Sequence, residues 1–297
     1  MSRGEWNDVR TEAPDRAPER AVDPDHSDRR PALSTDRLNL PQSDRREPLE
    51  FRGREYRLRA SETRVLATVG AFRVVPAADL VAGRATPDNV KEDLRRLTEQ
   101  GLLECRTLPI NREPTRVVVL TRTGKALLDA HRESAGGRDQ QYHAGLVKPR
   151  ELAHDAQLYR LYQAEAEKLE DRGARVDRVV LDYELKRDYQ TFLNRPDRSE
   201  HADREEETAA FAAANRLPVI DDHLELPDLR IEYETKDGRL EYRDLELVTE
   251  HYSRSQLSGK ARAGFSLYRA AGAGRPRGAN RGTEGTPFDP HHLEQLL

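Results

Sequence analysis

The sequence predicts a mixed α/β protein with two folded units between disordered ends. Its 297 residues exceed the length of one typical domain, so two units are expected. The charge is segmented, because residues 51–132 carry 16 lysines and arginines against 10 aspartates and glutamates, although the whole chain has a net charge of -4. Apolar residues recur with helical spacing early in the chain and alternate as in strands later. Together these features predict a basic unit followed by an acidic α/β unit.

The two ends of the chain, residues 1–50 and 272–297, are rich in charged residues and poor in apolar ones. Such segments bury too little apolar surface to offset the entropy of an ordered chain, so both are expected to be disordered. The opening MSRGEWNDVR lacks the apolar core of a signal peptide, and no stretch is apolar enough for a membrane span. With a single cysteine, Cys105, no disulfide is expected. These features predict a cytoplasmic protein without a membrane partner.

Residues 51–132 predict a set of short helices followed by a hairpin. After Ser61, apolar residues recur with helical spacing, and a second clear helix begins at Thr86-Pro87 and ends at Gly101. LLECRTL and TRVVVLT then read as two strands, joined by PINREP as a loop. A last helix from Thr123 to His131 closes the unit.

This order resembles that of bacterial winged-helix regulators, in which a Leu-Thr-x-x-Gly-x-x-Leu turn, here Leu120 to Leu127, begins the last helix. The resemblance implies that the second clear helix enters the DNA major groove and that the hairpin is the wing. Their polar and basic side chains would then meet base edges and phosphates. The candidate DNA-binding residues are Asn89, Lys91, Arg95, Arg96, Asn111, Arg112 and Arg116. An ordinary charged surface or a protein-binding module is the alternative, because Glu92, Asp93 and Glu99 share the helix.

Residues 133–149 are expected to form a linker, and residues 150–271 a second unit. A helix is predicted over about 150–172, where leucines and a tyrosine form an apolar face. RVDRVVLDYEL follows as a strand that ends at Glu184, and an interrupted helical stretch comes next.

The second unit then carries a hairpin with two carboxylates. LRIEYET and RLEYRDLELV alternate as strands and meet at Asp237-Gly238, a strong hairpin signal, and a helix is predicted from about Ser255 to Arg269. This order resembles the core of the PD-(D/E)xK nuclease-like superfamily, with Pro227-Asp228 before the hairpin and Glu246 near its end. Two carboxylates on adjacent strands can bind Mg²⁺. Asp228 and Glu246 are therefore candidate metal ligands and catalytic residues of a restriction-endonuclease-like α/β domain.

The chain departs from that pattern at the lysine. Val248 stands at the expected position, so Lys260 on the following helix is the candidate for orienting or polarising the attacking water. Glu184 is the candidate for a third acidic ligand. As an alternative, Asp228 is only a turn residue at the entry of a strand, and Glu246 only an exposed strand carboxylate.

From about 51 to 270 the chain resembles the replication-relaxation (MobC-like) proteins of plasmids and integrated mobile elements. The matching features are His154-Asp155 on a helix, the Pro227-Asp228 hairpin, Glu246 with Thr249, and a helix from Lys260 to Tyr268. The resemblance implies a DNA-binding accessory factor in plasmid replication, relaxation or mobilisation. Its expected partners are double-stranded DNA, relaxase or replication proteins, and a second copy of the chain as a homodimer.

Two other functions stay open from the sequence. One is a Mg²⁺-dependent endonuclease that the winged helix targets, and the other is a transcription regulator whose second unit senses a ligand. The missing lysine after Glu246 favours the accessory role over the endonuclease. His154 is interpreted as a packing or hydrogen-bonding residue rather than as a metal ligand.

Overall fold

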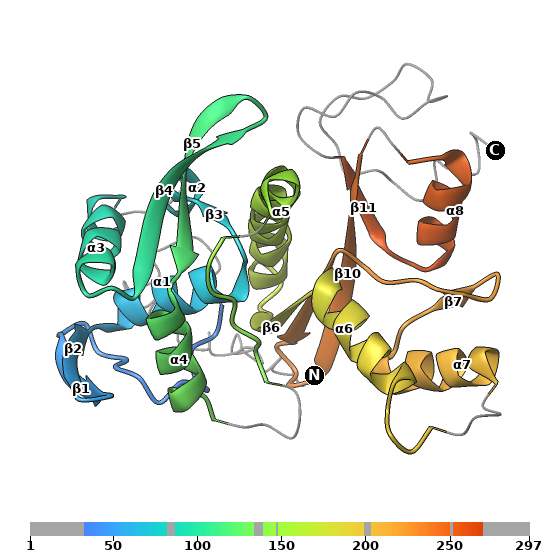
Figure 1. The fold of residues 1–297 in the computed structure, drawn as a ribbon, viewed down its shortest axis with the longest axis horizontal. Helices are drawn as coiled ribbons and strands as arrows, with labels where there is room; N and C mark the ends of the chain where they lie inside the picture. The colour runs from blue at the N-terminus through green and yellow to red at the C-terminus, as the bar shows by residue number, and fades with distance from the viewer. Residues whose placement is uncertain are drawn as a thin grey trace, which may run out of the picture.

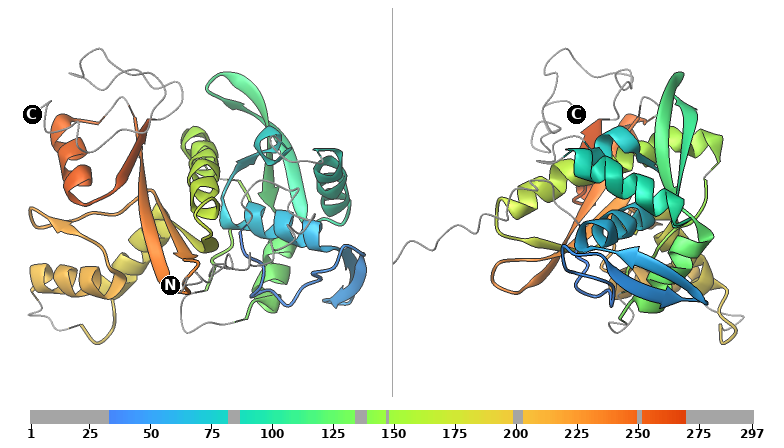
Figure 2. Two further views of the ribbon diagram at one scale, coloured as in Figure 1. Left: turned by 180° about the vertical axis from the view of Figure 1, so that it is seen from behind. Right: turned by 90° about the vertical axis from the view of Figure 1, so that its left-hand side faces the viewer.

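The computed structural model of this protein describes residues 33–81, 87–133, 139–146, 148–198, 203–249 and 252–269. Within these ranges it is a mixed α/β protein, as the sequence predicts. The chain forms a first unit (33–133) and a second unit (148–269) that lie side by side in Figure 1 and in the left view of Figure 2. Helix α5 (Leu152–Glu170) of the second unit lies on the side that faces the first unit.

The first unit consists of helices around a small antiparallel sheet. The sheet has the strand order β3-β5-β4, and α1 packs on both α3 and β5. The apolar positions Val90, Leu94 and Leu97 of α3 are buried, as the helical spacing predicts. The elements are α1 (Ala60–Ala71), β3 (Val75–Pro76), α2 (Ala77–Val81), α3 (Pro87–Glu99), β4 (Leu103–Ile110), β5 (Glu113–Leu120) and α4 (Arg122–His131).

A glycine fixes the approach of α4 to the start of β4. A Cβ atom on Gly124 would lie 2.3 Å from the backbone oxygen of Leu102, which no side chain tolerates. Thr121 caps the same helix by accepting a hydrogen bond from the Gly124 N–H (3.0 Å) and donates its hydroxyl to the Gly101 carbonyl (2.7 Å). The Leu-Thr-x-x-Gly-x-x-Leu motif therefore encodes a close backbone contact.

The loop of the β4–β5 hairpin is shorter than PINREP suggests. Pro109 pairs with Pro114 and Ile110 with Glu113, so the turn consists of Asn111 and Arg112 alone, both with positive φ. Two left-handed residues make the tight turn that matches the twist of a hairpin. Ile110 and Glu113 flank the turn, and Pro109 and Pro114 form the next pair of the ladder. Residues at that next position do not exchange backbone hydrogen bonds, so the two prolines, which lack an N–H, are tolerated there.

The expected disorder of residues 1–50 is wrong for the part that the structure describes, residues 33–50. Leu33, Leu38 and Leu40 are buried, and strand β1 (Glu47–Phe51) pairs with β2 (Arg54–Leu58). These few leucines are too sparse to form a core, but they pack on a core that the rest of the chain provides. Residues 1–32 and 272–297, for which disorder is also predicted, lie outside the described residues.

The second unit is built on a sheet of order β11-β10-β9-β6. Strand β9 pairs antiparallel with β10, which confirms the predicted hairpin, and α5 packs on one face of the sheet. The elements are η1 (Pro149–Glu151), α5 (Leu152–Glu170), β6 (Arg175–Leu181), α6 (Asp182–Leu193), α7 (Arg204–Asn215), β7 (Val219–Ile220), β8 (His223–Leu224), β9 (Leu229–Glu234), β10 (Leu240–Val248), α8 (Arg254–Arg262) and β11 (Ser266–Arg269).

Two predicted boundaries in the second unit are wrong. The helix expected to reach Arg269 ends at Arg262, and the chain turns at Gly264 (φ 80) into β11, which runs parallel to β10. Buried Phe265 and Leu267 alternate with less buried neighbours there, which suits a strand. The strand expected to end at Glu184 ends at Leu181, so Glu184 lies in the first turn of α6.

The two units share one hydrophobic core, which includes α1, α5 and the second sheet. Phe72 at the end of α1 contacts Tyr159 and Tyr162 of α5, with ring centroids 5.2 and 5.0 Å away. The expected linker is part of this packing. Gln140 exchanges two hydrogen bonds with the backbone of Val179 on strand β6 (2.9 and 3.0 Å). The units are therefore joined by packed side chains rather than by a free tether.

Candidate functional site

Asp228 and Glu246, the predicted acidic pair, lie next to each other on the second sheet. Leu229 pairs with Leu245, so the next position outward places Asp228 opposite Glu246. The Asp228 N–H donates to Glu246 Oε2 (3.2 Å), and the Leu247 N–H donates to Asp228 Oδ2 (2.9 Å). Each carboxylate thus accepts a hydrogen bond from the backbone of the other strand. The exposed-carboxylate alternative is wrong for Glu246, which is 1% exposed.

Lys260 of α8 also reaches this pair. Its Nζ lies 3.1 Å from Glu246 Oε1 and 3.1 Å from Glu225 Oε2, and it donates to the Leu226 carbonyl (2.8 Å). Val248, at the position where the related pattern has lysine, is buried among apolar side chains. The ammonium group therefore approaches Glu246 from the following helix, as the sequence suggests for a displaced lysine.

Two further side chains complete the surroundings of the pair. The Tyr252 hydroxyl donates to Glu246 Oε1 (2.6 Å). His154 of α5 has Nε2 3.4 Å from Asp228 Oδ1 and Nδ1 3.4 Å from Asp155 Oδ1. The interpretation of His154 as a hydrogen-bonding residue fits these contacts. Its place beside Asp228 depends on how α5 packs on the sheet, and the sequence carries no signal for that.

A row of charged side chains links the pair to the first unit. Asp155 faces His154 on one side and, at 3.5 Å, the Nε of Arg73 on the other. Arg73 lies just after α1 and also pairs with Glu151 (2.6 Å). The row Asp228, His154, Asp155, Arg73 therefore runs from the second sheet to the end of α1.

The charges in this site perturb one another strongly. Burial raises the pKa of the Glu246 carboxyl, and the charge of Asp228 raises it further, while Lys260 and Tyr252 act in the opposite direction. Burial lowers the pKa of His154, but its hydrogen bonds and charge interactions with Asp155 and Asp228 outweigh that effect and raise the pKa to about 10. His154 is therefore a cation at neutral pH, and it flanks the acidic pair opposite Lys260.

Glu184, the predicted third acidic ligand, does not join the pair. As a residue of the first turn of α6, it accepts a hydrogen bond from the Leu181 N–H (3.3 Å) and faces His143 Nε2 (3.4 Å) and Arg178. The reason is the early end of β6, which turns the side chain towards the seam between the units. Within the described part of the chain, no three His, Cys, Asp or Glu side chains form a group that could hold a metal ion.

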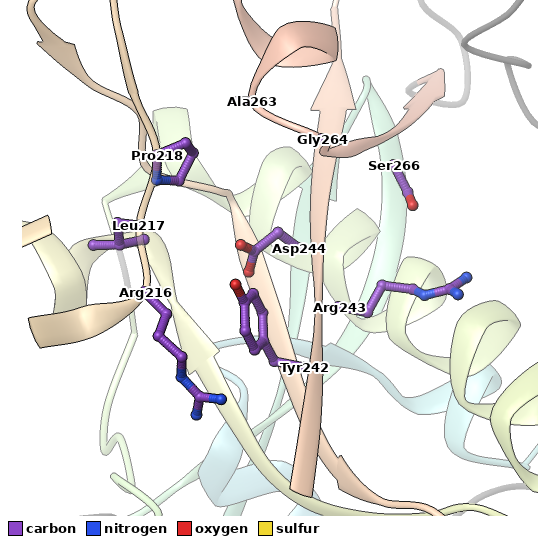
Figure 3. A pocket seen from close by; sticks show the side chains of 9 residues that line it. All are labelled: Arg216, Leu217, Pro218, Tyr242, Arg243, Asp244, Ala263, Gly264 and Ser266. Carbon is purple, nitrogen blue, oxygen red and sulfur yellow. The ribbon is translucent and has the colours of Figure 1, made fainter. Parts of the chain in front are cut away.

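The face of the sheet that carries the acidic pair stays polar further along the hairpin. Arg230 is buried and donates two hydrogen bonds to Asp244 (2.6 and 2.8 Å). These two residues face each other on β9 and β10, two positions along the strands from Asp228 and Glu246. Figure 3 shows the Tyr242 and Asp244 side chains pointing to one side of β10 and Arg243 to the other. They border a hollow of about 620 Å³ together with Arg216, Leu217, Pro218, Ala263, Gly264 and Ser266.

The candidate DNA-binding residues lie on the first unit, on α3 and on the β4–β5 hairpin. Lys91 and Arg95 are exposed and Arg96 is partly exposed, but each forms an ion pair with a carboxylate of α3 itself, at Asp88, Glu92 or Glu99. Asp93 is instead buried and pairs with Arg59 (2.7 Å) and Arg46 (3.7 Å). The exposed face of α3 is therefore close to electrically neutral.

The basic residues of the β4–β5 hairpin, unlike those of α3, are not all neutralised by ion pairs. Arg112 and Arg116 are exposed, and among the described residues neither has a carboxylate partner. Asn111 and Arg112 form the turn at the tip, which projects beyond α2 and α3 (Figure 1).

None of the described helices combines the length and apolar character needed to cross a membrane. Comparison of the chain with protein-family models, with curated proteins and with solved structures finds no match.

Proposed function

We propose that this protein binds double-stranded DNA through its first unit, which we interpret as a winged helix, and that it is an accessory factor in the replication, relaxation or mobilisation of a plasmid or mobile element. The observation that carries the DNA-binding part is the position of α3 beside a projecting hairpin whose Arg112 and Arg116 are exposed and have no carboxylate partner among the described residues. The accessory role rests on the family resemblance of the sequence.

The order of elements supports the winged-helix interpretation. Helices α1, α2 and α3 precede a hairpin that pairs with the short strand β3 to make a three-stranded sheet. In folds of this kind the last helix before the hairpin enters the major groove, and the hairpin contacts the backbone. Unlike Arg95 and Arg96, Arg112 and Arg116 have no carboxylate partner among the described residues, so we expect them to contribute more phosphate contacts.

We propose for the second unit a nuclease-like fold that serves mainly as a platform for contacts. The acidic pair has the oxygen donors that Mg²⁺ prefers, so the residue types fit the ion. However, every oxygen of Asp228 and Glu246 already has a hydrogen-bond or ion-pair partner in the protein, and Glu184 points elsewhere. An ion would have to share these oxygens with Lys260, Tyr252, His154 and two backbone N–H groups.

A metal-dependent endonuclease is the second candidate function. The contact of 3.1 Å between Lys260 Nζ and Glu246 favours it, because it supplies the ammonium group that the sequence lacks at Val248. Asp228 and Glu246 would then hold Mg²⁺, and the ion would stabilise charge on a phosphate oxygen.

The test of the first proposal uses the full chain and duplex DNA at several salt concentrations. Its affinity should fall steeply with salt, and Arg112→Ala with Arg116→Ala should lower the slope of log affinity against log salt by about 2. The matched control is Arg239→Ala with Arg262→Ala, which removes two exposed arginines of the second unit. Equal losses in both double variants, or no DNA binding even at low salt, would overturn the proposal.

The same preparation distinguishes the two roles of the second unit. Supercoiled plasmid is incubated with the protein with and without Mg²⁺. Nicking that needs the metal and is lost in both Asp228→Ala and Glu246→Ala would establish the endonuclease. A shift in plasmid mobility without nicking supports the accessory role.

A further inference from the structure

A hollow of about 390 Å³ lies at the seam between the two units, and the acidic pair is not part of its lining. Its walls come from the end of α1, from α4, from the segment 141–146 that joins the units, and from α6. The polar side chains of its lining include Arg73, Lys125, His143, Tyr183 and Arg187. We refer to this cavity as the seam hollow.

The lining of the seam hollow is cationic. It includes two arginines and a lysine, and none of its lining residues in the described part of the chain is an aspartate or glutamate. The hollow beside β10 contains Asp244, and the groove beside α3 contains Glu99, so the lack of acidic lining sets the seam hollow apart from both. A concave surface of one charge sign concentrates ligands of the opposite sign.

The walls of the seam hollow are fixed by the fold. The His143 N–H donates to the Gly70 carbonyl and the Gly145 N–H to the Leu120 carbonyl, both at 2.8 Å, so the joining segment is tied to the first unit. Tyr142, directly before His143, is 3% exposed. A site whose backbone is already ordered loses little conformational entropy when a ligand binds.

The cations of the lining are available in different degrees. Lys125 pairs with Asp129 and Arg187 with Asp188, and in each pair both partners are at least a third exposed. Such surface pairs contribute little to stability and exchange readily for another anion. Arg73 is more buried, is held by Glu151 (2.6 Å) and Asp155 (3.5 Å), and lies over the Tyr183 ring at 5.0 Å. One fixed guanidinium and two exchangeable cations therefore face the same space.

We propose that the seam hollow binds a small phosphate-bearing molecule. A phosphate group offers several acceptor oxygens and accepts paired hydrogen bonds from arginine, which suits Arg73 and Arg187. The volume is within the range of small-molecule sites, roughly 300–1,000 Å³. The Tyr183 hydroxyl, which contacts His143 Nε2 at 3.0 Å, adds a polar group beside the cations.

The ligand would touch both units at once. Lys125 and Arg73 belong to the first unit, and Tyr183 and Arg187 to the second. The proposal does not depend on the DNA-binding function, because it rests on the lining of the seam hollow alone.

The test is calorimetric titration of the full chain with adenosine 5′-monophosphate, inorganic phosphate and adenosine. Adenosine 5′-monophosphate and phosphate should bind, and adenosine should not. Lys125→Ala with Arg187→Ala should weaken binding roughly tenfold or more, because each removes a charge-assisted hydrogen bond. Lys186→Ala is the matched control, since Lys186 is an exposed cation of α6 outside the lining and should leave affinity unchanged.

Three results would overturn the proposal. The first is the absence of binding by both phosphate compounds. The second is equal affinity for adenosine and its phosphate. The third is an unchanged affinity in the Lys125→Ala, Arg187→Ala variant. If these substitutions instead weaken duplex DNA binding while the small phosphates do not bind, the cations serve a DNA backbone and the small-molecule site is wrong. The charge-conserving Lys125→Arg, Arg187→Lys variant should bind more tightly than the double alanine variant, because it keeps both charges although it loses the paired hydrogen bonds of Arg187; this separates loss of charge from loss of fold.

Discussion

The Glu246 carboxylate lies between a cation, Lys260, and a second acid, Asp228. It is 1% exposed, and Lys260 and Asp228 act on it in opposite directions. Buried carboxylates of this kind are stable only as long as their cation stays in place, because an unpaired charge in a protein interior is costly. The residue therefore connects the chemistry of the site to the stability of the fold.

The first prediction concerns the ion pair of Lys260 and Glu246. Lys260→Met should lower the free energy of unfolding by about 3 kcal/mol, because it leaves the Glu246 carboxylate buried without its ammonium partner. The loss should shrink as the pH falls and Glu246 takes up a proton. Urea unfolding at several pH values measures it. Lys260→Met combined with Glu246→Gln should recover part of the loss, and Arg262→Ala, at an exposed pair on the same helix, should cause none. A loss independent of pH would contradict the explanation.

The second prediction concerns His154. Its pKa of about 10 in the folded protein is above the ordinary value of 6.5, so the stabilisation from its charged form is complete below that ordinary value. It is lost as the pH rises through about 10. His154→Gln should therefore lower the free energy of unfolding at neutral pH and remove the contribution of this residue to the loss of stability at higher pH. Titration of the His154 ring by NMR checks the pKa, and Asp228→Asn should lower it. A ring that titrates near 6.5 would refute the charged contact.

At the scale of elements, the approach of α4 to β4 depends on the missing side chain of Gly124. The third prediction is that Gly124→Ala lowers the free energy of unfolding by about 2–3 kcal/mol or more, because its Cβ meets the Leu102 carbonyl at 2.3 Å. Gly259→Ala in α8 is the opposite case. Its Cβ would have an ordinary contact of 3.4 Å, so helix propensity should give a gain of about 0.5–1 kcal/mol. Thermal unfolding of both variants tests the pair.

The elements that were predicted correctly are those with a local signal. The β9–β10 hairpin has Asp237-Gly238 between alternating strands, and α4 has its Thr121 cap and Gly124. Strand β11 has no such signal, because its four residues form a strand only when β10 is beside them. Leu33 is likewise buried by partners that lie far away in the sequence.

The candidate site was predictable to the same extent. Asp228 and Glu246 follow from the hairpin register, and Lys260 follows from the lack of a lysine at Val248. The His154 contact could not be derived, because it depends on the packing of α5 against β9. Glu184 was misplaced because the change from strand to helix at Asp182 has no glycine or proline to mark it.

At the scale of the whole molecule, the shared core predicts how the protein unfolds. Phe72, Tyr159 and Tyr162 bury their rings against one another across the two units. The fourth prediction is a single cooperative transition, followed alike by the tyrosine signal of near-UV circular dichroism and by hydrogen exchange in both units. Phe72→Ala should lower the free energy of unfolding by about 3–5 kcal/mol and destabilise both units together. Two separate transitions in the wild-type chain would contradict this expectation.

Because α5 packs against the first unit, the two units of this protein cannot simply be separated or exchanged. A segment cut at residue 133 would leave Phe72 and its neighbours without the tyrosines that cover them, and would also lose the Gln140 anchor on β6. Grafting the first unit onto another protein therefore requires that α5 and the joining segment are transferred with it. Exchange of the exposed α3 side chains and of the Asn111-Arg112 tip needs no such transfer, so the surface that we propose to contact DNA can change more easily by substitution than by exchange of whole units.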